Sequence, residues 1–386
     1  MVSFNDLPIR DDLRGLTPYG APQKHVSIRL NVNENTHPIP EAVATDIVTA
    51  LAAVVLDLNR YPDREFVQLR ESLASYLGSG LTRDNIWAAN GSNEVLQQIL
   101  QAFGGPGRNL LGFPPTYSMH SIIAAGTGTT WIAGERDAGF EISPQTAVHW
   151  IEKTDPDIVF FCSPNNPTGT PLSLETIVAA YDASHGIVVV DEAYAEFAPA
   201  DLPSALSLLA GRERLIVSRT MSKAFAFAGA RLGFLAADPA VSDALRLVRL
   251  PYHLSALTQA AAIAALAHSG EMLAMVDDIK EQRDRLLVEL PRLGYPVWRS
   301  WANFVLFGGV ENPHAVFEAL LEQDIIIRDI GIPNHLRVTA GTARETTAFL
   351  AALGALDAGA IDAGALDAGA LGAVPHDAGA LGKVNP

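Results

Sequence analysis

The sequence predicts an α/β protein with a mainly parallel sheet between helices, joined to a smaller α+β domain. Between about residues 85 and 260, apolar runs such as Ile158–Phe161, Ile187–Val190 and Leu215–Val217 alternate with segments of helical periodicity. Each run is continuously apolar, which is typical of strands buried on both faces. Alternation of such strands with helices favours a parallel sheet covered by helices.

The helical segments support the same fold class. One helix is expected to begin near Ser92, because apolar residues from Val95 to Phe103 fall on one of its faces. After about residue 265 the pattern changes to that of a smaller domain. It is expected to contain a long charged helix over Met272–Leu290, strands at Phe304–Phe307, Ile325–Arg328 and Leu336–Thr339, a helix near His314–Glu322 and a last helix.

These patterns divide the chain into four parts. We expect residues 1–50 to join the small domain, residues 51–265 to form the large domain, and residues 266–353 to form the small domain. Residues 354–386 contain a repeated five-residue unit (LDAGA, IDAGA, LDAGA) that is rich in glycine and lacks aromatic residues. This composition predicts a disordered tail outside the folded body.

Composition excludes several functional classes. The net charge of −16 over 386 residues argues against general binding of nucleic acid or of an anionic membrane. The N-terminus has no signal-peptide pattern, and no stretch approaches the roughly 20 apolar residues of a membrane span. The single cysteine, Cys162, follows an apolar run and is expected in a strand; a chain with one cysteine suits the reducing cytoplasm.

Polar residues follow three of the predicted strands, at Ser163–Asn166, Asp191–Glu192 and Ser218–Thr220. Ligands of open α/β sheets bind outside the carboxyl ends of the strands. We therefore expect these three segments to deliver polar groups to one rim of the sheet.

Each polar segment has a catalytic and an ordinary interpretation. Lys223 lies beside hydroxyl residues and ahead of Arg231, so it can be an imine-forming lysine near a phosphate, or a solvated loop lysine. Asp191 can hold a protonated ring nitrogen, or cap a helix. The turn at Asn166 can aim an amide at a ligand, or be a plain turn. Gly91-Ser92-Asn93 can bind phosphate at a helix N-terminus, or simply cap that helix.

Taken together and in this order, these segments resemble the fold type I aminotransferases, which use pyridoxal 5′-phosphate. The resemblance covers about residues 10–352 and implies a seven-stranded sheet. It extends to the histidinol-phosphate aminotransferase branch through further motifs: Arg14…Pro18-Tyr19, Leu30…Asn33-Glu34-Asn35, Arg60-Tyr61-Pro62-Asp63, Pro115-Thr116-Tyr117-Ser118-Met119, Cys162–Gly169 and Ser218–Arg231.

The resemblance implies specific roles around the cofactor. Lys223 corresponds to the lysine that holds pyridoxal phosphate as a Schiff base and moves the proton. Asp191 corresponds to the partner of the ring nitrogen, Asn166 and Tyr194 to donors to the ring oxygen, and Tyr117 to the aromatic stacked on the ring. The phosphate-binding positions are Ser92, Asn93, Thr220, Ser222 and Arg231. Tyr61 corresponds to a tyrosine supplied by the partner subunit, which implies a homodimer with shared active sites.

The resemblance also implies substrate contacts. Arg337 corresponds to the arginine that binds a substrate carboxylate, and a guanidinium fork suits carboxylate or phosphate. Arg328 is expected either to meet a second anionic group or to form a salt bridge with an acid such as Asp329. Tyr19 and Asn33 are further candidates. Two departures from the branch, Thr36 in place of proline and His120 in place of tyrosine, are expected near the substrate.

The expected reaction interconverts L-histidinol phosphate and 2-oxoglutarate with imidazole-acetol phosphate and L-glutamate, a step of histidine biosynthesis, without a metal. Two alternatives stay open, an aromatic amino-acid aminotransferase and a threonine-phosphate decarboxylase. An aminotransferase-like transcription regulator is disfavoured by the acidic charge. A nicotinamide dehydrogenase is disfavoured because Gly104–Gly107 follows a helix and contains a proline.

Overall fold

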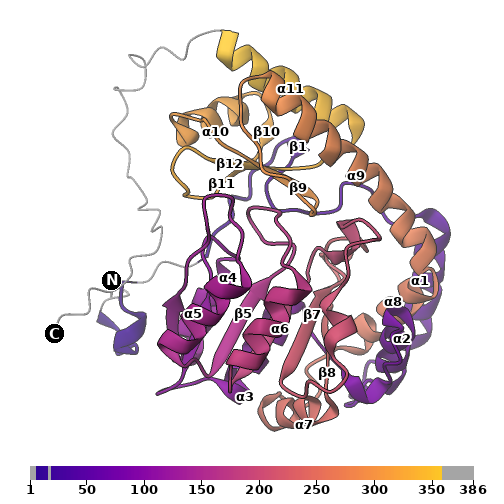
Figure 1. The fold of residues 1–386 in the computed structure, drawn as a ribbon. Helices are drawn as coiled ribbons and strands as arrows, with labels where there is room; N and C mark the ends of the chain where they lie inside the picture. The colour runs from indigo at the N-terminus through magenta and orange to yellow at the C-terminus, as the bar shows by residue number, and fades with distance from the viewer. Residues whose placement is uncertain (1–5, 16–18, 359–386) are drawn as a thin grey trace.

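A seven-stranded sheet forms the centre of the large domain in the computed structural model, which describes residues 6–15 and 19–358 (Figure 1). The strand order is β2-β8-β7-β6-β5-β3-β4. Strand β8 runs antiparallel to both its neighbours, and the other pairs are parallel. The predicted mainly parallel, seven-stranded sheet is therefore confirmed. The strands are β2 (Ile86–Ala89), β3 (Asn109–Gly112), β4 (Thr130–Ala133), β5 (Ile158–Cys162), β6 (Ile187–Asp191), β7 (Leu215–Thr220) and β8 (Gly233–Ala237).

The central strands β5, β6 and β7 are buried except for the half-buried Ile187 that begins β6, as their apolar runs predicted. Cys162 lies within β5 as expected. The predicted ends of two strands were wrong: Asp191, expected after its strand, is the last residue of β6. Ser218, Arg219 and Thr220 were expected after the strand, but they form the last three residues of β7. Their backbones pair with β8, and their polar side chains find buried partners at the sheet rim, so polarity did not end the strand.

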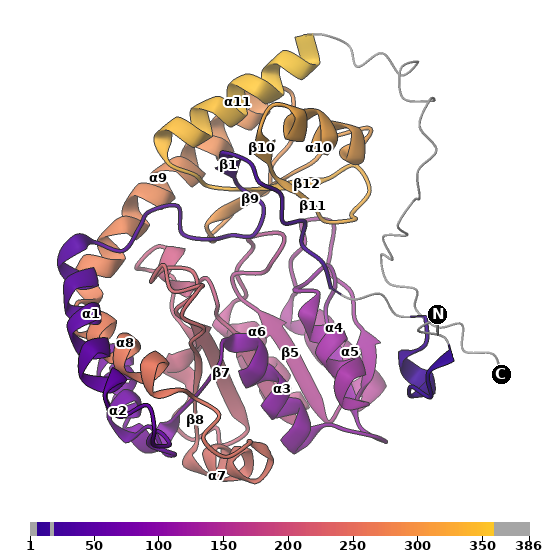
Figure 2. The same cartoon turned by 180° about the vertical axis from the view of Figure 1, so that it is seen from behind.

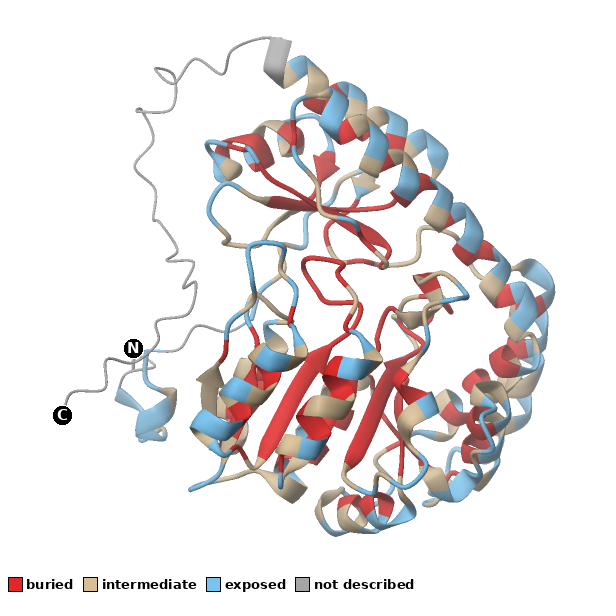
Figure 3. Cartoon of the chain, viewed as in Figure 1, coloured by how far each residue is buried: buried red, intermediate tan, exposed pale blue. Residues whose placement is uncertain are grey.

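Helices cover both faces of this sheet. Helices α5 and α6 lie in front of it in Figure 1, and α3 lies in front of it in the opposite view of Figure 2. Their sheet-facing sides are buried and their outer sides exposed (Figure 3). The helices of this part are α1 (Glu41–Val55), α2 (Val67–Leu77), α3 (Ser92–Phe103), α4 (Met119–Thr127), α5 (Pro144–Thr154), α6 (Leu174–Ala183), α7 (Pro239–Val248) and α8 (Ala256–Ala267), with the short 3-10 helices Asp11–Leu13, Arg83–Asn85, Ala195–Phe197 and Ala205–Leu208.

The small domain lies beyond the carboxyl ends of the parallel strands (Figure 1). Its antiparallel sheet has the order β11-β12-β9, and β1 pairs in parallel with β10. The strands are β1 (Ile28–Arg29), β9 (Phe304–Phe307), β10 (Ile325–Ile326), β11 (Arg328–Asp329) and β12 (Leu336–Thr339), and the helices are α9 (Ser269–Arg292), α10 (Pro313–Glu322) and α11 (Ala343–Ala358). The single strand expected over Ile325–Arg328 is instead split at Ile327 between two sheets, because β10 pairs with β1 and β11 with β12.

The N-terminal part of the chain contacts both domains. Strand β1 extends the small domain, whereas α1 packs along α8 beside the large sheet (Figure 1). The boundaries expected after residues 50 and 265 fall inside α1 and α8, so the domain division stays a prediction. Helix α11 continues to Ala358, so the segment predicted as a disordered tail begins within a helix; its remainder, 359–386, lies outside the described residues. In the described part of the chain, we find no helix with the length and apolarity that a bilayer crossing requires.

Candidate active site

Lys223 lies in the loop between β7 and β8, at the rim that faces the small domain. Its Nζ donates a hydrogen bond of 3.0 Å to the backbone carbonyl of Val32. Burial, reinforced by the positive charge of Arg337, lowers the pKa of Lys223 from 10.5 to about 8, against the opposing pull of Glu34. A substantial fraction of its amine is therefore neutral near physiological pH, as a nucleophile or a general base requires.

Asp191 is the last residue of β6 and is buried at the same rim. Strand register places it beside Cys162 of β5 and Ser218 of β7. Its Oδ1 accepts a hydrogen bond of 3.1 Å from Ser218 Oγ, and its Oδ2 lies 3.4 Å from His120 Nε2. Asp191 is therefore a buried carboxylate with a donor on each oxygen, which suits it to hold a cationic ring nitrogen.

His120 corrects one expectation. We expected this departure from the family pattern near the substrate, but the fully buried ring lies against Asp191 and packs edge-on to Tyr117 and Phe160, at 5.6 and 5.2 Å between centroids. Because an ionised carboxylate only accepts hydrogen bonds, we assign the proton to Nε2. His120 is the second residue of α4, and 71 residues separate it from Asp191, so no local sequence pattern indicates this contact.

The hydroxyl of Tyr194 accepts hydrogen bonds from two side-chain amides. Asn33 Nδ2 donates to Tyr194 Oη at 3.0 Å, and Asn166 Nδ2 donates at 3.2 Å. Burial raises the pKa of Tyr194. Asn33 was expected as a substrate contact; its side chain instead joins Tyr194 to Thr339 of the small domain, whose Oγ1 donates to Asn33 Oδ1 at 3.1 Å. The structure thus brings Tyr194 and Asn166 together as expected.

Tyr117 lies between the rim and the start of α3. Its hydroxyl donates to Asn93 Oδ1 at 3.1 Å, and burial raises its pKa. This bond fixes the phenol end of the ring, and His120 packs against the ring itself. Tyr117 is therefore held in a way that suits a stacking platform.

The predicted phosphate-binding residues converge at one place. In the sheet, Gly233 of β8 pairs with Ala89, the last residue of β2, and with Thr220, the last residue of β7. Because α3 begins three residues after Ala89, its start lies near the end of β7. A Cβ on Gly233 would lie 2.1 Å from the backbone nitrogen of Ser92, and one on Gly91 would lie 2.4 Å from Arg231 Nη2. Both glycines are needed because the α3 N-terminus and the Arg231 guanidinium approach so closely.

Hydroxyl groups complete this cluster. Thr220 Oγ1 donates to Ser222 Oγ at 3.0 Å and accepts from the Ser222 backbone N–H at 3.1 Å. Arg231 has a left-handed backbone (φ 58°), and its guanidinium donates to the carbonyls of Ala228 and Asn90. A helix N-terminus, two hydroxyls and a guanidinium form the kind of cradle that binds phosphate.

Arg337 projects from β12 of the small domain and is buried. Its Nη1 donates to Asn166 Oδ1 and its Nη2 to the Asn31 carbonyl at 2.8 Å, whereas its buried Nε has no hydrogen-bond partner among the described residues. Burial lowers the pKa of Arg337 to about 10, which leaves it cationic at neutral pH. A buried cation with an unused donor beside the cofactor cluster is suited to bind an anion.

Arg328 and Tyr19 lie next to this arginine. Arg328 is the cross-strand partner of Arg337, and its guanidinium lies 5.9 Å from the centre of the Tyr19 ring. The carboxylate of Asp329, the alternative partner considered from sequence, accepts a hydrogen bond from the Gly331 backbone instead. The arrangement therefore favours Arg328 as part of an anion-binding site.

Tyr61 is not part of this cluster within one chain. Its side chain is 80% exposed and stacks on Tyr252 with ring centroids 4.4 Å apart. Thr36, the other departure from the family pattern, has a buried hydroxyl with no hydrogen-bond partner among the described residues.

Comparison with known proteins decides the family. Residues 26–353 match the family model of the class I and II aminotransferases. The chain belongs to this family. The aminotransferase is 63% identical to a histidinol-phosphate aminotransferase of Paenarthrobacter aurescens (strain TC1), over 91% of this chain and 95% of that protein. It is 55% identical to a histidinol-phosphate aminotransferase of Thermobifida fusca (strain YX), over 91% of this chain and 96% of that protein.

Solved structures share the fold. A histidinol-phosphate aminotransferase from Sinorhizobium meliloti in complex with pyridoxal-5′-phosphate has a TM-score of 0.81 at 24% identity, over 90% of this chain and 97% of that one. An aspartate aminotransferase from Thermotoga maritima has a TM-score of 0.76 at 21% identity, over 87% of this chain and 92% of that one. The predicted fold type I architecture and the predicted class of pyridoxal-phosphate-dependent transaminase are confirmed; individual residue roles stay predictions.

The cluster fits the cofactor of this family. Pyridoxal phosphate supplies an electron sink for the charge that forms at the substrate Cα. The chain offers a lysine of lowered pKa, a buried carboxylate, two amides around a phenol, and a cradle whose close packing requires two glycines. These groups come from separate strand ends and match the parts of the cofactor in kind.

Proposed function

We propose that this aminotransferase interconverts L-histidinol phosphate and 2-oxoglutarate with imidazole-acetol phosphate and L-glutamate, in histidine biosynthesis. The observation that carries the proposal is the pairing of Arg328 with Arg337 across β11 and β12, with the Nε of Arg337 unused. The names of relatives at 53–63% identity support the same substrate.

The two arginines address a recognition problem in this reaction. Histidinol phosphate carries a phosphate and no carboxylate, whereas glutamate carries two carboxylates. A guanidinium fork accepts either anion through paired hydrogen bonds, so one pair of arginines can serve both substrates. Tyr19, beside Arg328, offers an aromatic face near the substrate end of the site.

We assign the cofactor roles as follows. Lys223 holds the cofactor covalently and transfers the proton between the substrate Cα and the cofactor. Asp191 keeps the ring nitrogen protonated, Asn166 and Tyr194 donate to the ring oxygen, and Tyr117 covers the ring. The phosphate is bound by Ser92, Asn93, Thr220, Ser222 and Arg231. These assignments are supported by the lowered pKa of Lys223, by the two donors to Asp191, and by the close approach of Arg231 and the α3 N-terminus at Gly91 and Gly233.

The proposal includes a homodimer in which Tyr61 reaches the cofactor phosphate of the partner subunit. Tyr61 stacks on Tyr252, and both side chains are exposed, as is Leu250 two residues before Tyr252. Exposed apolar side chains in one region are typical of a protein interface. The cytoplasmic location stays a prediction from the single cysteine.

A panel of amino donors tests the substrate. The holoenzyme is mixed with L-histidinol phosphate, phenylalanine or threonine phosphate, and conversion of the cofactor to pyridoxamine phosphate is followed by absorbance. The proposal requires the highest kcat/KM with L-histidinol phosphate. A strong preference for phenylalanine, or release of carbon dioxide from threonine phosphate, would contradict it.

A further inference from the structure

Arg136 lies in the loop after β4, outside every motif that the sequence analysis used. Its Nε donates to the Phe113 carbonyl at 2.8 Å, its Nη1 to the Phe140 carbonyl at 3.0 Å, and its Nη2 to Asn165 Oδ1 at 3.0 Å. Burial lowers its pKa to about 10, so it stays cationic at neutral pH. Because the guanidinium is planar and rigid, it holds these three oxygens in a fixed geometry.

Asn165 is fully buried, and its side-chain amide makes four hydrogen bonds. Its Oδ1 accepts from Thr116 Oγ1 at 3.1 Å as well as from Arg136. Its Nδ2 donates to the Pro115 carbonyl at 3.0 Å and to Thr168 Oγ1 at 2.8 Å. One side chain therefore joins the loop that precedes α4 to the turn that follows β5.

These contacts involve the immediate neighbours of two residues assigned to the cofactor ring. Thr116 precedes Tyr117, and Asn165 precedes Asn166. We propose that Arg136 and Asn165 are positioning residues that fix the separation of Tyr117 and Asn166, and with it the seat of the cofactor ring. The inference rests on the roles proposed above for Tyr117 and Asn166.

The same contacts reach the small domain. The Phe140 carbonyl that Arg136 binds also accepts from Thr170 Oγ1 at 3.2 Å. The ring of Phe140 packs edge-on against Trp298 and His335, at 5.1 and 6.1 Å between centroids. Since His335 is two residues before Arg337, Arg136 links the ring-binding loops to the segment that carries the proposed anion-binding arginine.

The chemistry of Arg136 favours a role in geometry over one in stability. All three of its hydrogen-bond partners are neutral oxygens. Removing a charge from water costs free energy, and apolar packing often replaces such buried charges without loss of stability. A guanidinium at this position supplies what apolar residues cannot, which is simultaneous hydrogen bonding to three separate loops.

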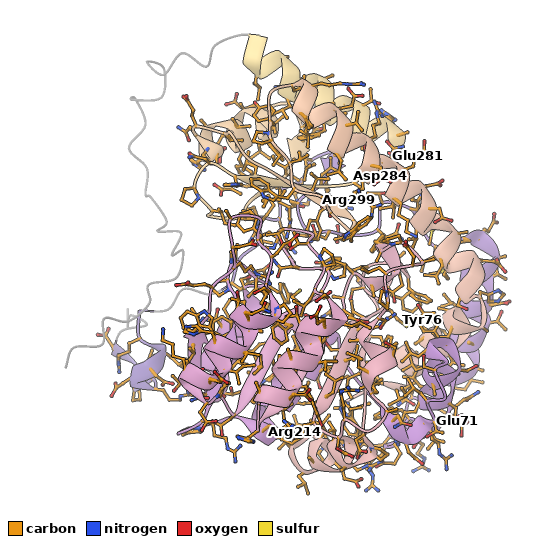
Figure 4. The ribbon with its side chains drawn as sticks, in the orientation of Figure 1. Glu71, Tyr76, Arg214, Glu281, Asp284 and Arg299 are labelled. Carbon is orange, nitrogen blue, oxygen red and sulfur yellow. The ribbon has the colours of Figure 1, made fainter. Side chains whose placement is uncertain are left out.

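Arg214 is a matched control. It too is half-buried and donates to backbone carbonyls, those of Ser184 at 2.8 Å and Gly186 at 2.7 Å. It lies at the opposite end of the large sheet, far from the small domain (Figure 4). Arg214→Lys therefore measures the general cost of replacing a carbonyl-bound guanidinium without touching the ring-binding loops.

The test compares Arg136→Lys, Thr116→Val and Arg214→Lys as holoenzymes. The measurements are the rate of cofactor release, the visible circular dichroism per bound cofactor and the melting temperature. Arg136→Lys and Thr116→Val should each speed cofactor release about tenfold, equivalent to about 1.4 kcal/mol, and change the dichroism. Arg214→Lys should change only the melting temperature.

Two reference variants separate the inference from the function it rests on. Tyr117→Ala and Asn166→Ala should each speed cofactor release; if neither does, the proposed cofactor site is wrong. A second result is that both reference variants speed release while Arg136→Lys and Thr116→Val match Arg214→Lys in release rate and dichroism. That result would show that the positioning role is wrong and would leave the proposed cofactor site intact. If Arg136→Lys does not fold, Thr116→Val decides by the same two readouts.

Discussion

Arg328 and Arg337 are directly opposite each other across the antiparallel strands β11 and β12. Side chains of such a pair lie on the same side of a sheet. The Arg337 guanidinium contacts Asn166, and the Arg328 guanidinium lies over the Tyr19 ring. Like charges in this arrangement repel, and the charge of Arg328 adds to burial in lowering the pKa of Arg337. An anionic ligand would relieve this repulsion, which supports the proposal that the pair binds an anionic group of the substrate.

Replacement of these arginines is expected to separate binding from chemistry. Arg337→Lys keeps a positive charge but loses the fork, so kcat/KM for both the phosphate donor and glutamate should fall by about 10- to 100-fold. Arg328→Ala should raise KM with little change in kcat. Steady-state kinetics with both donors measure this, with Arg299→Ala as a surface control. An unchanged KM in Arg328→Ala would rule out its contact with the substrate.

The start of α3 gives a prediction about cofactor affinity. Gly91→Ala places a Cβ 2.4 Å from Arg231 Nη2 on a backbone with φ of 88°. The matched control is Gly78→Ala, where φ is also positive, at 64°, but no atom lies within 4 Å of the new Cβ. Both variants should lose about 1–3 kcal/mol of stability through backbone strain. Titration of the apoenzymes should show weakened cofactor binding in Gly91→Ala alone; equal affinity in the two variants would argue against the cradle.

His120 gives a prediction that sequence reasoning alone did not reach. His120→Phe removes one of the two donors to Asp191 while keeping an aromatic ring against Tyr117 and Phe160. Cofactor affinity should fall about tenfold, because each charge-assisted hydrogen bond contributes roughly 1.5–3 kcal/mol. His120→Gln, which can still donate, should retain more affinity. Equal loss in both variants would mean that His120 only fills space.

The pKa of Lys223 gives a pH-dependent prediction. A folded-state pKa of about 8, below the ordinary 10.5, means that the folded apoprotein binds fewer protons than the unfolded chain between these pH values. Burial of Lys223 therefore lowers the free energy of unfolding by its full amount below pH 8. This destabilisation disappears as the pH rises towards 10.5. Lys223→Met should raise the melting temperature of the apoprotein at pH 7, by an amount that shrinks above pH 8. A difference independent of pH would contradict the lowered pKa.

Much of the fold followed from local patterns. Continuous apolar runs marked β5, β6 and β9 because these strands are buried on both faces, and burial favours apolar side chains. The end of β7 was missed because Ser218, Arg219 and Thr220 are polar but satisfied by buried partners, which a one-dimensional pattern does not register.

The site was predictable where residues stay close in sequence and much less so where they meet across the fold. Lys223 and Ser222 form one motif, so their proximity was expected. The contact of His120 with Asp191 and that of Arg136 with Asn165 depend on long-range packing, since 71 and 29 residues separate the partners. The contacts of Asn33 with Tyr194 and Thr339 were missed for the same reason, and its substrate contact stays a prediction.

The covalent attachment of the cofactor to Lys223 is the central claim, and it is directly measurable. The holoenzyme is reduced with borohydride, digested, and the cofactor-modified peptide is identified by mass spectrometry, with Lys223→Ala as the control. We expect the modification on Lys223. The variant should show no modification, no lysine-aldimine absorbance and no turnover. Modification of another lysine, such as Lys24, Lys153 or Lys280, or wild-type turnover in Lys223→Ala, would contradict the account.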